Sequence, residues 1–306
     1  MRQLLSGGAL CLAVALATGA TPFPVAAQAS GASASDAVSN VADALSLRVG
    51  ERTSTATRAA LLADTRMQEI VVDDDNYKRP MRMHAIPFAD WLTAMMPDAA
   101  KAAAQGATAT VVATDGYVSH IPLTLLLGHL PRQPQAYLAV APENAPWPPL
   151  KGDAIGPFRL VWRTPPGPAR GGVNESHWTY SIGRIEITPS PRERFPVLRP
   201  AANTPPGSAI MRGAAVFERA CFSCHSLNGA GDAHLGPDLN TPSSPVEYLG
   251  ERRLAALIRN PQSLRWWPNS RMPAIDRATV SDTELTDLLA YLHHMSGRKA
   301  PPPNAK

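Results

Sequence analysis

Cys221-Phe222-Ser223-Cys224-His225 is the stretch of sequence that decides the fold of the second half of this chain. It has the form C-x-x-C-H, which is typical of covalent attachment of a c-type haem. Each thiol at this spacing can add to one vinyl group of the porphyrin, and the imidazole that follows directly can bind the iron. The adjoining histidine and the lack of a second cysteine pair argue against a zinc site and against dithiol redox chemistry. The sequence therefore predicts one covalently bound haem c, with Cys221 and Cys224 as attachment residues and His225 as the proximal iron ligand.

The first residues have the features of a secretory signal peptide. A short basic start precedes an apolar run over residues 10–20, and small residues continue to Ala29. The apolar run is too short to span a bilayer, so we expect a signal peptide over residues 1–29 and no transmembrane segment in the mature chain. Cys11 would be removed with it, which leaves the two motif cysteines for the haem and none for a disulfide. Because haem is attached to such motifs outside the cytoplasm, we expect a periplasmic protein.

Length and composition limit the architecture and the partners. With 306 residues and 44% hydrophobic content, the chain can form two ordinary cores after the leader is removed. The formal net charge of +4 is small for this length and no run of Lys or Arg is present, so the sequence gives no sign of nucleic-acid binding. A weakly basic surface is compatible with an acidic redox partner, and more simply with an ordinary solvated surface.

The region before the motif is predicted to be an α+β domain. Residues 30–64 are rich in Ala, Ser and Thr and predict a flexible lead-in that turns helical over 58–63. Residues 65–194 alternate β-branched runs with turn signals, and a mixed order of strands and short helices is typical of α+β domains. The predicted strands cover 68–72, 79–86, 107–113, 117–121, 136–140, 158–162 and 178–187, and a short helix is predicted over 122–130.

A further helix in this region is predicted to begin after Pro87. Its apolar residues at helical spacing are Phe88, Trp91, Leu92, Met95 and Met96. Methionines can bind haem iron, but at this spacing core packing explains them better. The region also has four histidines without the spacing of metal ligands, which we expect to be exposed or hydrogen-bonded: His84, His120, His129 and His177.

Three segments of this region resemble the sulfite-oxidase-type molybdopterin-binding domain. They are His84-Ala85-Ile86-Pro87-Phe88-Ala89-Asp90-Trp91-Leu92, Thr114-Asp115-Gly116-Tyr117 and Gly156-Pro157-Phe158-Arg159-Leu160-Val161. That family ligates molybdenum through a cysteine, and residues 65–190 contain none. The resemblance therefore implies a degenerate relative, used for docking or for binding a small ligand, without a molybdenum centre of the usual kind.

A Pro-rich linker over residues 195–207, extended and semi-rigid, precedes the predicted all-α haem domain over 208–297 and a tail over 298–306. Ser208 is a suitable N-cap for a helix over 209–220. A second helix is predicted over 245–259, with its buried side formed by Tyr248, Leu249, Leu254, Leu257 and Ile258. The last helix begins at a capping box of Ser281 and Glu284, and its apolar stripe consists of Leu285, Leu288, Leu289 and Leu292.

Several motifs in this domain together resemble the class I cytochrome c family. They are Gly213-x-x-x-Phe217, the C-x-x-C-H run, Leu235-Gly236-Pro237-Asp238-Leu239 and Met272-Pro273. The resemblance implies that Gly213 lets the first and last helices cross closely and that Phe217 packs beside the crossing. It also implies that the carbonyl of Pro237 accepts a hydrogen bond from His225 Nδ1, and that Met272 is the second axial ligand of the iron.

The identity of the second axial ligand separates the possible functions. Met272 lies in a Pro-rich loop where no helical stripe explains it as core, and His234 in a Gly-rich loop is its main rival. Methionines and histidines on helices are better explained by packing or exposure: Met211, Met295, His293 and His294. One of the residues that flank this loop can reach a haem propionate. For each of them taken singly, packing or solvation is the better explanation. The four residues are Arg265, Trp266, Trp267 and Arg271.

With both axial positions filled, no site remains for a substrate on the iron. The sequence therefore favours a one-electron carrier without catalytic residues, which docks redox partner proteins over the haem edge and carries an additional α+β domain. An enzyme is the alternative, either with a five-coordinate haem or with a substrate or cofactor in the N-terminal domain. A sensory or assembly role is a third possibility, which nothing beyond the two domains supports.

Overall fold

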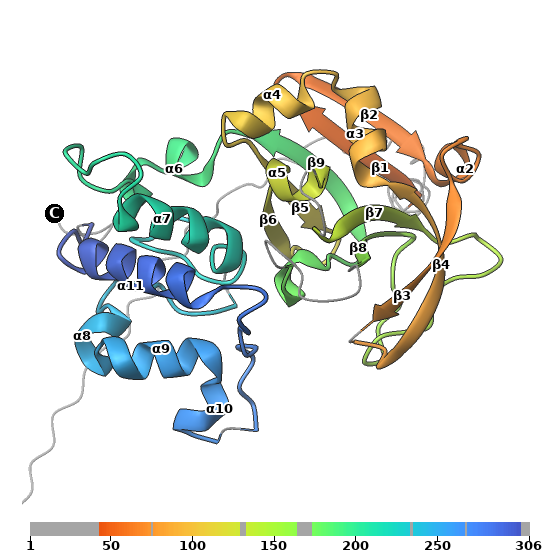
Figure 1. The fold of residues 1–306 in the computed structure, drawn as a ribbon. Coiled ribbons are helices and arrows are strands. Elements are labelled where there is room, and N and C mark those ends of the chain that lie inside the picture. Colours follow the sequence, from red (N-terminus) through yellow and green to blue (C-terminus); the bar gives the residue numbers. More distant parts are fainter. Residues whose placement is uncertain are drawn as a thin grey trace, which may run out of the picture.

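The computed structural model describes residues 43–74, 76–128, 133–163, 173–232, 235–266 and 268–300. A sheet-rich region over residues 44–188 lies beside a helical region over residues 209–296 (Figure 1). This is the predicted order, an α+β domain followed by an all-α domain. Several predictions concern positions outside the described residues, namely the signal peptide, His129, His234, Trp267 and residues 301–306. In the described part of the chain, none of the helices combines the length and apolar character that crossing a membrane requires.

Two sheets form the N-terminal region. Its elements are β1 (Ala44–Val49), β2 (Arg52–Thr57), α2 (Arg58–Leu62), β3 (Gln68–Asp74), β4 (Arg79–Pro87), α3 (Phe88–Met95), α4 (Ala99–Ala104), β5 (Thr108–Ala113), β6 (Val118–Pro122), α5 (Leu123–Leu127), β7 (Gln135–Val140), β8 (Phe158–Arg163), the 3-10 turn η1 (Glu175–His177) and β9 (Ile182–Thr188). The strand orders are β2-β1-β9-β5-β6 and β3-β4-β7-β8. Apolar side chains from both sheets share one core, among them Leu47, Val111, Leu138 and Phe158.

The expected flexible lead-in over residues 30–64 is wrong from residue 44 onward. β1 buries Leu45 and Leu47, and it pairs with β2 and, in parallel, with β9 near the end of the domain. The expected helix over 58–63 is confirmed as α2. The pairing with β9 was missed because that strand lies far away in sequence. The hairpin of β1 and β2 was missed because a composition rich in Ala, Ser and Thr is not typical of strands.

Two details of the N-terminal region differ from the expectation. Met95 is 40% exposed and does not belong to the core, because α3 ends there and the chain turns away, while Met96 is partly buried. The last strand begins at Ile182 and not at Trp178, because the preceding segment forms η1, whose end is closed by a hydrogen bond from the Trp178 amide to the Glu175 carbonyl at 3.1 Å.

The Pro-rich linker is packed and not simply extended. It contains the short helical turn η2 (Pro196–Leu198), and the turn α6 (Pro191–Arg194) comes directly before it. Leu198 is fully buried in the core of the helical region, and its carbonyl accepts a hydrogen bond from the Tyr291 hydroxyl at 2.8 Å. Two apolar side chains in the linker, Phe195 and Leu198, attach it to the helical core, which its many prolines did not indicate.

The helical region consists of α7 (Ala209–Ala220), α8 (Pro245–Leu249), α9 (Glu251–Arg259), α10 (Pro261–Leu264) and α11 (Asp282–Ser296). α7 and α11 cross at Gly213, where a Cβ atom would lie 1.9 Å from the carbonyl oxygen of Asp287. Phe217 packs beside the crossing, with its ring centroid 5.6 Å from that of Tyr291. The predicted bounds of α7 and the capping box of α11 are confirmed.

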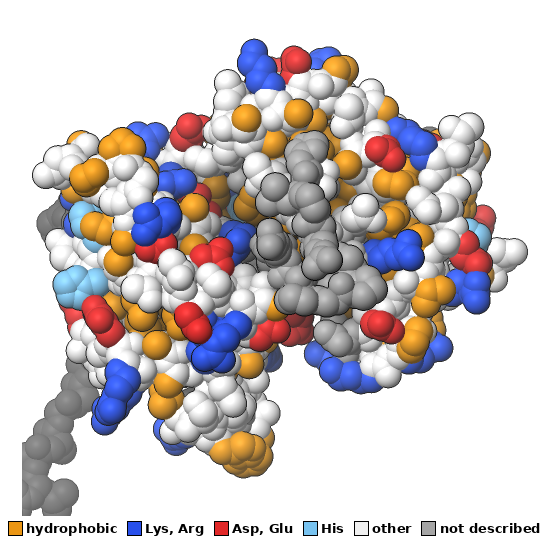
Figure 2. Space-filling model, viewed as in Figure 1, with side chains coloured by type: hydrophobic (Ala, Val, Ile, Leu, Met, Phe, Trp, Pro, Cys, Tyr) orange, Lys and Arg blue, Asp and Glu red, His pale blue; other side chains and the backbone are white. Residues whose placement is uncertain are grey.

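The predicted helix over residues 245–259 is interrupted. Gly250 has a φ of +73°, a conformation that favours glycine, and it separates α8 from α9. Tyr248 therefore does not belong to the buried side and is 60% exposed, whereas Leu254 and Ile258 are buried as expected. On the face of the molecule that Figure 2 shows, acidic and basic side chains are interspersed, in keeping with the small net charge.

Candidate functional site

The C-x-x-C-H motif follows α7 directly and continues it by one irregular turn. The amides of Cys221 and Phe222 donate to the Phe217 carbonyl at 2.9 and 3.0 Å. The amides of Cys224 and His225 donate to the Cys221 carbonyl at 3.0 and 2.9 Å. In a helical turn, residues three apart lie on the same side, so this backbone brings the two thiols together.

A hydrogen bond to the loop that follows the motif fixes the orientation of the His225 imidazole. Its Nδ1 lies 2.8 Å from the carbonyl oxygen of Pro237, and because a carbonyl can only accept, Nδ1 carries the proton and Nε2 keeps its lone pair. Burial lowers the pKa of His225, partly offset by this hydrogen bond, which favours the neutral form that binds metals. A Cβ atom at Gly236 would lie 2.4 Å from the imidazole Cε1, so only glycine fits beneath the ring.

Burial raises the pKa of both thiols of the motif. Burial raises the pKa of Cys221 to about 12, and the neighbouring Cys224 contributes to this. Burial and the charge of Glu175 raise the pKa of Cys224 as well. Reactive dithiols instead have pKa values lowered by nearby positive charge. Together with the neutral imidazole, these thiols fit covalent attachment of a haem.

Asp238 holds the loop that carries Pro237. Its carboxylate accepts hydrogen bonds from the amides of Gly229, Asn240 and Thr241 at 2.7, 2.8 and 2.8 Å. Burial alone would raise the pKa of Asp238, but these hydrogen bonds outweigh it and lower the pKa. Two of the donors follow Asp238 closely in sequence, as in a turn formed by an aspartate, so the sequence contained a signal for this role.

Met272 contributes to the same apolar cluster as the motif. It is partly buried against the core of the helical region, and Cys221 is a second partly buried member of that cluster. The other candidate ligands lie on helices, where packing, a hydrogen bond or exposure to solvent explains each of them. Met295 is buried in α11, and His294 accepts a hydrogen bond from the Ala201 amide at 3.0 Å. Met211 is partly buried on α7, and His293 is exposed on α11.

Arg259 anchors the chain that follows Met272, a role that sequence reasoning missed. Its Nη1 donates to the carbonyls of Ile275, Asp276 and Val280 at 3.1, 3.1 and 2.6 Å. These acceptors are backbone atoms far from Arg259 in sequence, so no motif marks the contact. A single guanidinium thus holds the segment between Met272 and α11.

We expect Arg259→Met to loosen this segment while keeping the aliphatic stem of the side chain. Loss of the donors should lower the free energy of unfolding by about 2 kcal/mol, and should speed hydrogen exchange at the Ile275 amide, which donates to the Ile258 carbonyl at 3.0 Å. Arg253→Met, at an exposed position of the same helix, is the matched control. Equal exchange rates in the two variants would contradict the anchoring role.

The described histidines of the N-terminal region differ in environment. His84 is exposed. His120 is buried with its Nε2 3.1 Å from Asp232 Oδ2. His177 is fully buried, and burial lowers its pKa to about 4, with nearby Arg219 acting in the same direction and a backbone hydrogen bond opposing it. The expectation of exposed or hydrogen-bonded histidines is confirmed for these three.

The low pKa of His177 makes stability depend on pH. Between about pH 6.5 and about pH 4 the unfolded chain binds a proton at this site and the folded chain does not, so stability should rise with pH across this window. This pKa shift corresponds to about 3 kcal/mol of unfolding free energy. That contribution is fully present above pH 6.5 and is lost as the pH falls to 4. Urea unfolding of the wild type and of His177→Gln tests this. The difference in unfolding free energy between the wild type and this variant should vary with pH over this window, and a constant difference would contradict the prediction.

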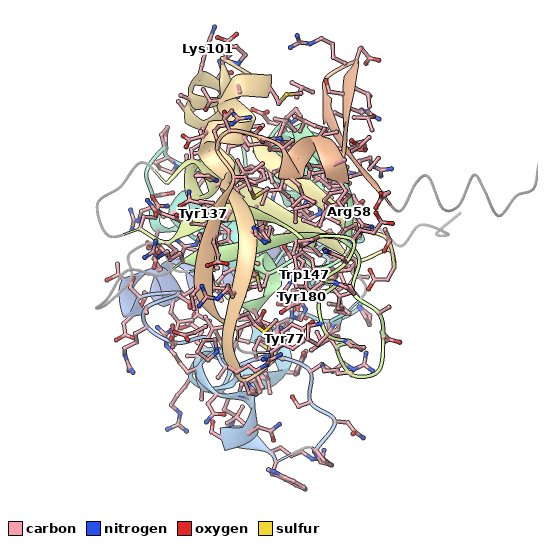
Figure 3. All side chains as sticks on the ribbon, turned by 90° about the vertical axis from the view of Figure 1, so that its right-hand side faces the viewer. Arg58, Tyr77, Lys101, Tyr137, Trp147 and Tyr180 are labelled. Carbon is pink, nitrogen blue, oxygen red and sulfur yellow. The ribbon has the colours of Figure 1, made fainter. Side chains whose placement is uncertain are left out.

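Arg159, in one of the segments that resemble the molybdopterin-binding family, lies in a closed cluster. It is fully buried, and its Nη2 donates to Asp74 Oδ2 at 2.5 Å. Tyr77, Trp147 and Tyr180, labelled close together in Figure 3, surround it with ring centroids 5.5, 5.1 and 4.0 Å from the guanidinium carbon. The cluster holds β3, β8 and the segment before β9 together. The family resemblance of this region stays a prediction, as does a propionate contact from the residues flanking Met272.

Comparison with known families matches residues 210–296 to the family described as cytochrome c. A search among curated proteins gives no match. The matched segment begins within α7, ends at the last residue of α11, and includes the motif, Pro237 and Met272. The helical C-terminal region is therefore a cytochrome c domain, which supports a haem c cofactor, a role in haem-based electron transfer and the existence of redox partners.

Proposed function

We propose that this protein is an exported c-type cytochrome that transfers single electrons through one haem c attached at Cys221 and Cys224. His225 and Met272 would bind its iron. The observation that carries the proposal is the arrangement of His225, whose Nδ1 is bound to the Pro237 carbonyl at 2.8 Å over a glycine that leaves room for the ring. This arrangement presents the lone pair of Nε2, and a neutral imidazole so fixed is a ligand held ready for iron.

Each residue of the site has a separate task in this function. When bound, the haem supplies a one-electron couple at its iron. The two cysteines tether the group, and Pro237 fixes the orientation and proton of the imidazole. Met272 offers a thioether, which favours Fe(II) relative to a second imidazole and so raises the reduction potential. With both residues bound to the iron, no site would remain there for a substrate, and the haem would exchange electrons with a docked partner protein.

Spectroscopy and a redox titration of the protein, produced together with haem-attachment machinery, test this function. We expect a low-spin spectrum in both oxidation states and a titration that follows a one-electron Nernst curve. Carbon monoxide should bind slowly, because it must displace Met272 from the iron. High-spin iron that binds carbon monoxide rapidly would overturn the carrier function and favour an enzyme with an open haem.

A further inference from the structure

Two elements of the N-terminal region contact the haem motif or the end of α7 that precedes it. Strand β6 lies beside α7 in Figure 1, and the turn η1 lies next to β6. The Ser119 hydroxyl and the Tyr117 hydroxyl both donate to the Ser176 carbonyl, at 2.7 and 3.0 Å, which joins β6 and its preceding turn to η1. The contact surface is therefore one connected unit of the N-terminal domain.

This unit closes the end of the helix that carries the motif. The last carbonyls of a helix have no partner within it and need one from elsewhere. His177 Nε2 lies 2.8 Å from the carbonyl oxygen of Arg219, and Asn174 Nδ2 donates to the carbonyl of Ala220 at 3.3 Å. Both carbonyls belong to the final residues of α7, so side chains of the other domain cap this helix immediately before Cys221.

The tautomer of His177 is fixed from both sides of the ring. The backbone amide of Asn174 donates to His177 Nδ1 at 3.1 Å. Nδ1 is therefore an acceptor, and the proton of the neutral ring must lie on Nε2. A proton on Nε2 is also what the carbonyl of Arg219 requires. The side chain is fully buried, which favours this neutral form. His177 therefore has one arrangement only, and it links the two domains by a defined hydrogen bond.

The two variable residues of the motif are also used in this contact. Ser223 is 2% exposed, and its hydroxyl accepts a hydrogen bond from the His120 amide at 2.9 Å. Phe222 is fully buried, with its ring centroid 4.8 Å from that of His120. Asp232, seven residues beyond His225, lies 3.1 Å from His120 and 2.8 Å from Arg194. The contact thus surrounds the attachment turn on the side of its Phe and Ser residues.

We propose that the N-terminal domain is a fixed part of the haem site, and that His177 is a positioning residue that holds the attachment turn through the end of α7. The proposal rests on the proposed function for the presence of haem. In this proposal the N-terminal domain supports the haem domain, because the surface formed by His120, Asn174 and His177 packs against the haem domain. A docking module that moves freely relative to the haem is excluded by this proposal.

Hydrogen exchange of the haem-loaded protein tests the positioning role. In His177→Phe we expect the amides of Cys221, Cys224 and His225 to exchange about tenfold faster, the equivalent of one lost buried hydrogen bond. The midpoint potential should shift in the same variant. His177→Gln should restore both, because its amide can donate to Arg219 and accept from Asn174. His294→Phe is the matched control, since it removes a histidine contact from the haem domain to the backbone of the linker at Ala201.

The outcomes separate this proposal from the proposed function. Exchange and potential unchanged in His177→Phe, or changed equally in His294→Phe, would overturn the positioning role. If His177→Phe does not fold, Ser223→Ala removes only the acceptor of the His120 amide and should speed the same exchange more weakly. A wild type without covalent haem would refute the proposed function instead, and the exchange comparison on that haem-free chain would still decide whether His177 holds the turn.

Discussion

Met272→Ala is expected to abolish the weak charge-transfer band in the far red that iron–thioether ligation produces in the oxidised protein. The iron should become high spin or acquire a water ligand. Because the thioether favours Fe(II), its loss should lower the reduction potential by a substantial fraction of the roughly 0.8 V range that axial ligands cover. Met272 is partly buried at the edge of the core, so the loss of packing should be small beside the loss of ligation.

Met211→Ala is the control for this experiment, since Met211 is a partly buried methionine on α7. It should keep the band and the potential. Met272→His adds a further comparison, because a second imidazole should keep the iron low spin while lowering the potential. Retention of the far-red band in Met272→Ala would show that another methionine ligates the iron, whereas a low-spin wild type without this band would make His234 the first residue to replace.

Gly213→Val is expected to prevent α7 and α11 from packing. A Cβ atom at this position would lie 1.9 Å from the carbonyl oxygen and 2.5 Å from the carbonyl carbon of Asp287. These are backbone atoms of the partner helix, so no side chain can move aside and the helices must separate. We expect a loss of more than about 3 kcal/mol of unfolding free energy, at the upper end of what overpacking costs.

Ala215→Val is the matched control for Gly213→Val, because Ala215 is exposed on the same helix and receives the same side chain. Valine is a better helix former than glycine and a poorer one than alanine, so helix propensity alone would rank the two variants in the opposite order. Urea unfolding of both variants measures the effect. A Gly213→Val protein as stable as Ala215→Val would contradict the close crossing.

Helix caps and motifs with fixed spacing were sufficient to predict parts of the structure. The Ser208 cap and the start of the motif at Cys221 bounded α7, and Ser281 with Glu284 marked the start of α11. The contact between His225 and Pro237 was implied by the order of motifs in a known family, and the structure has it at 2.8 Å. In these places, the residues that decide the geometry are neighbours in sequence or members of a motif with fixed spacing.

Contacts between segments that are distant in sequence could not be predicted from the sequence. β1 needs β9 as a partner, and the carbonyls that Arg259 binds are backbone atoms, which leave no trace in composition or periodicity. The break at Gly250 was visible as a glycine, but an isolated glycine does not by itself end a helix. The role of His177 depends on how two domains meet, and its sequence neighbourhood shows only a lone histidine.

Mass spectrometry of the protein produced with haem-attachment machinery tests most directly whether this chain carries haem c at its motif. We expect the intact wild-type chain to carry the mass of one haem, and the proteolytic peptide that contains Cys221 to His225 to hold all of it. The double variant Cys221→Ala, Cys224→Ala should carry none. A wild-type chain with two free thiols at this motif, or with haem that dissociates on denaturation, would contradict covalent attachment and with it the proposed function.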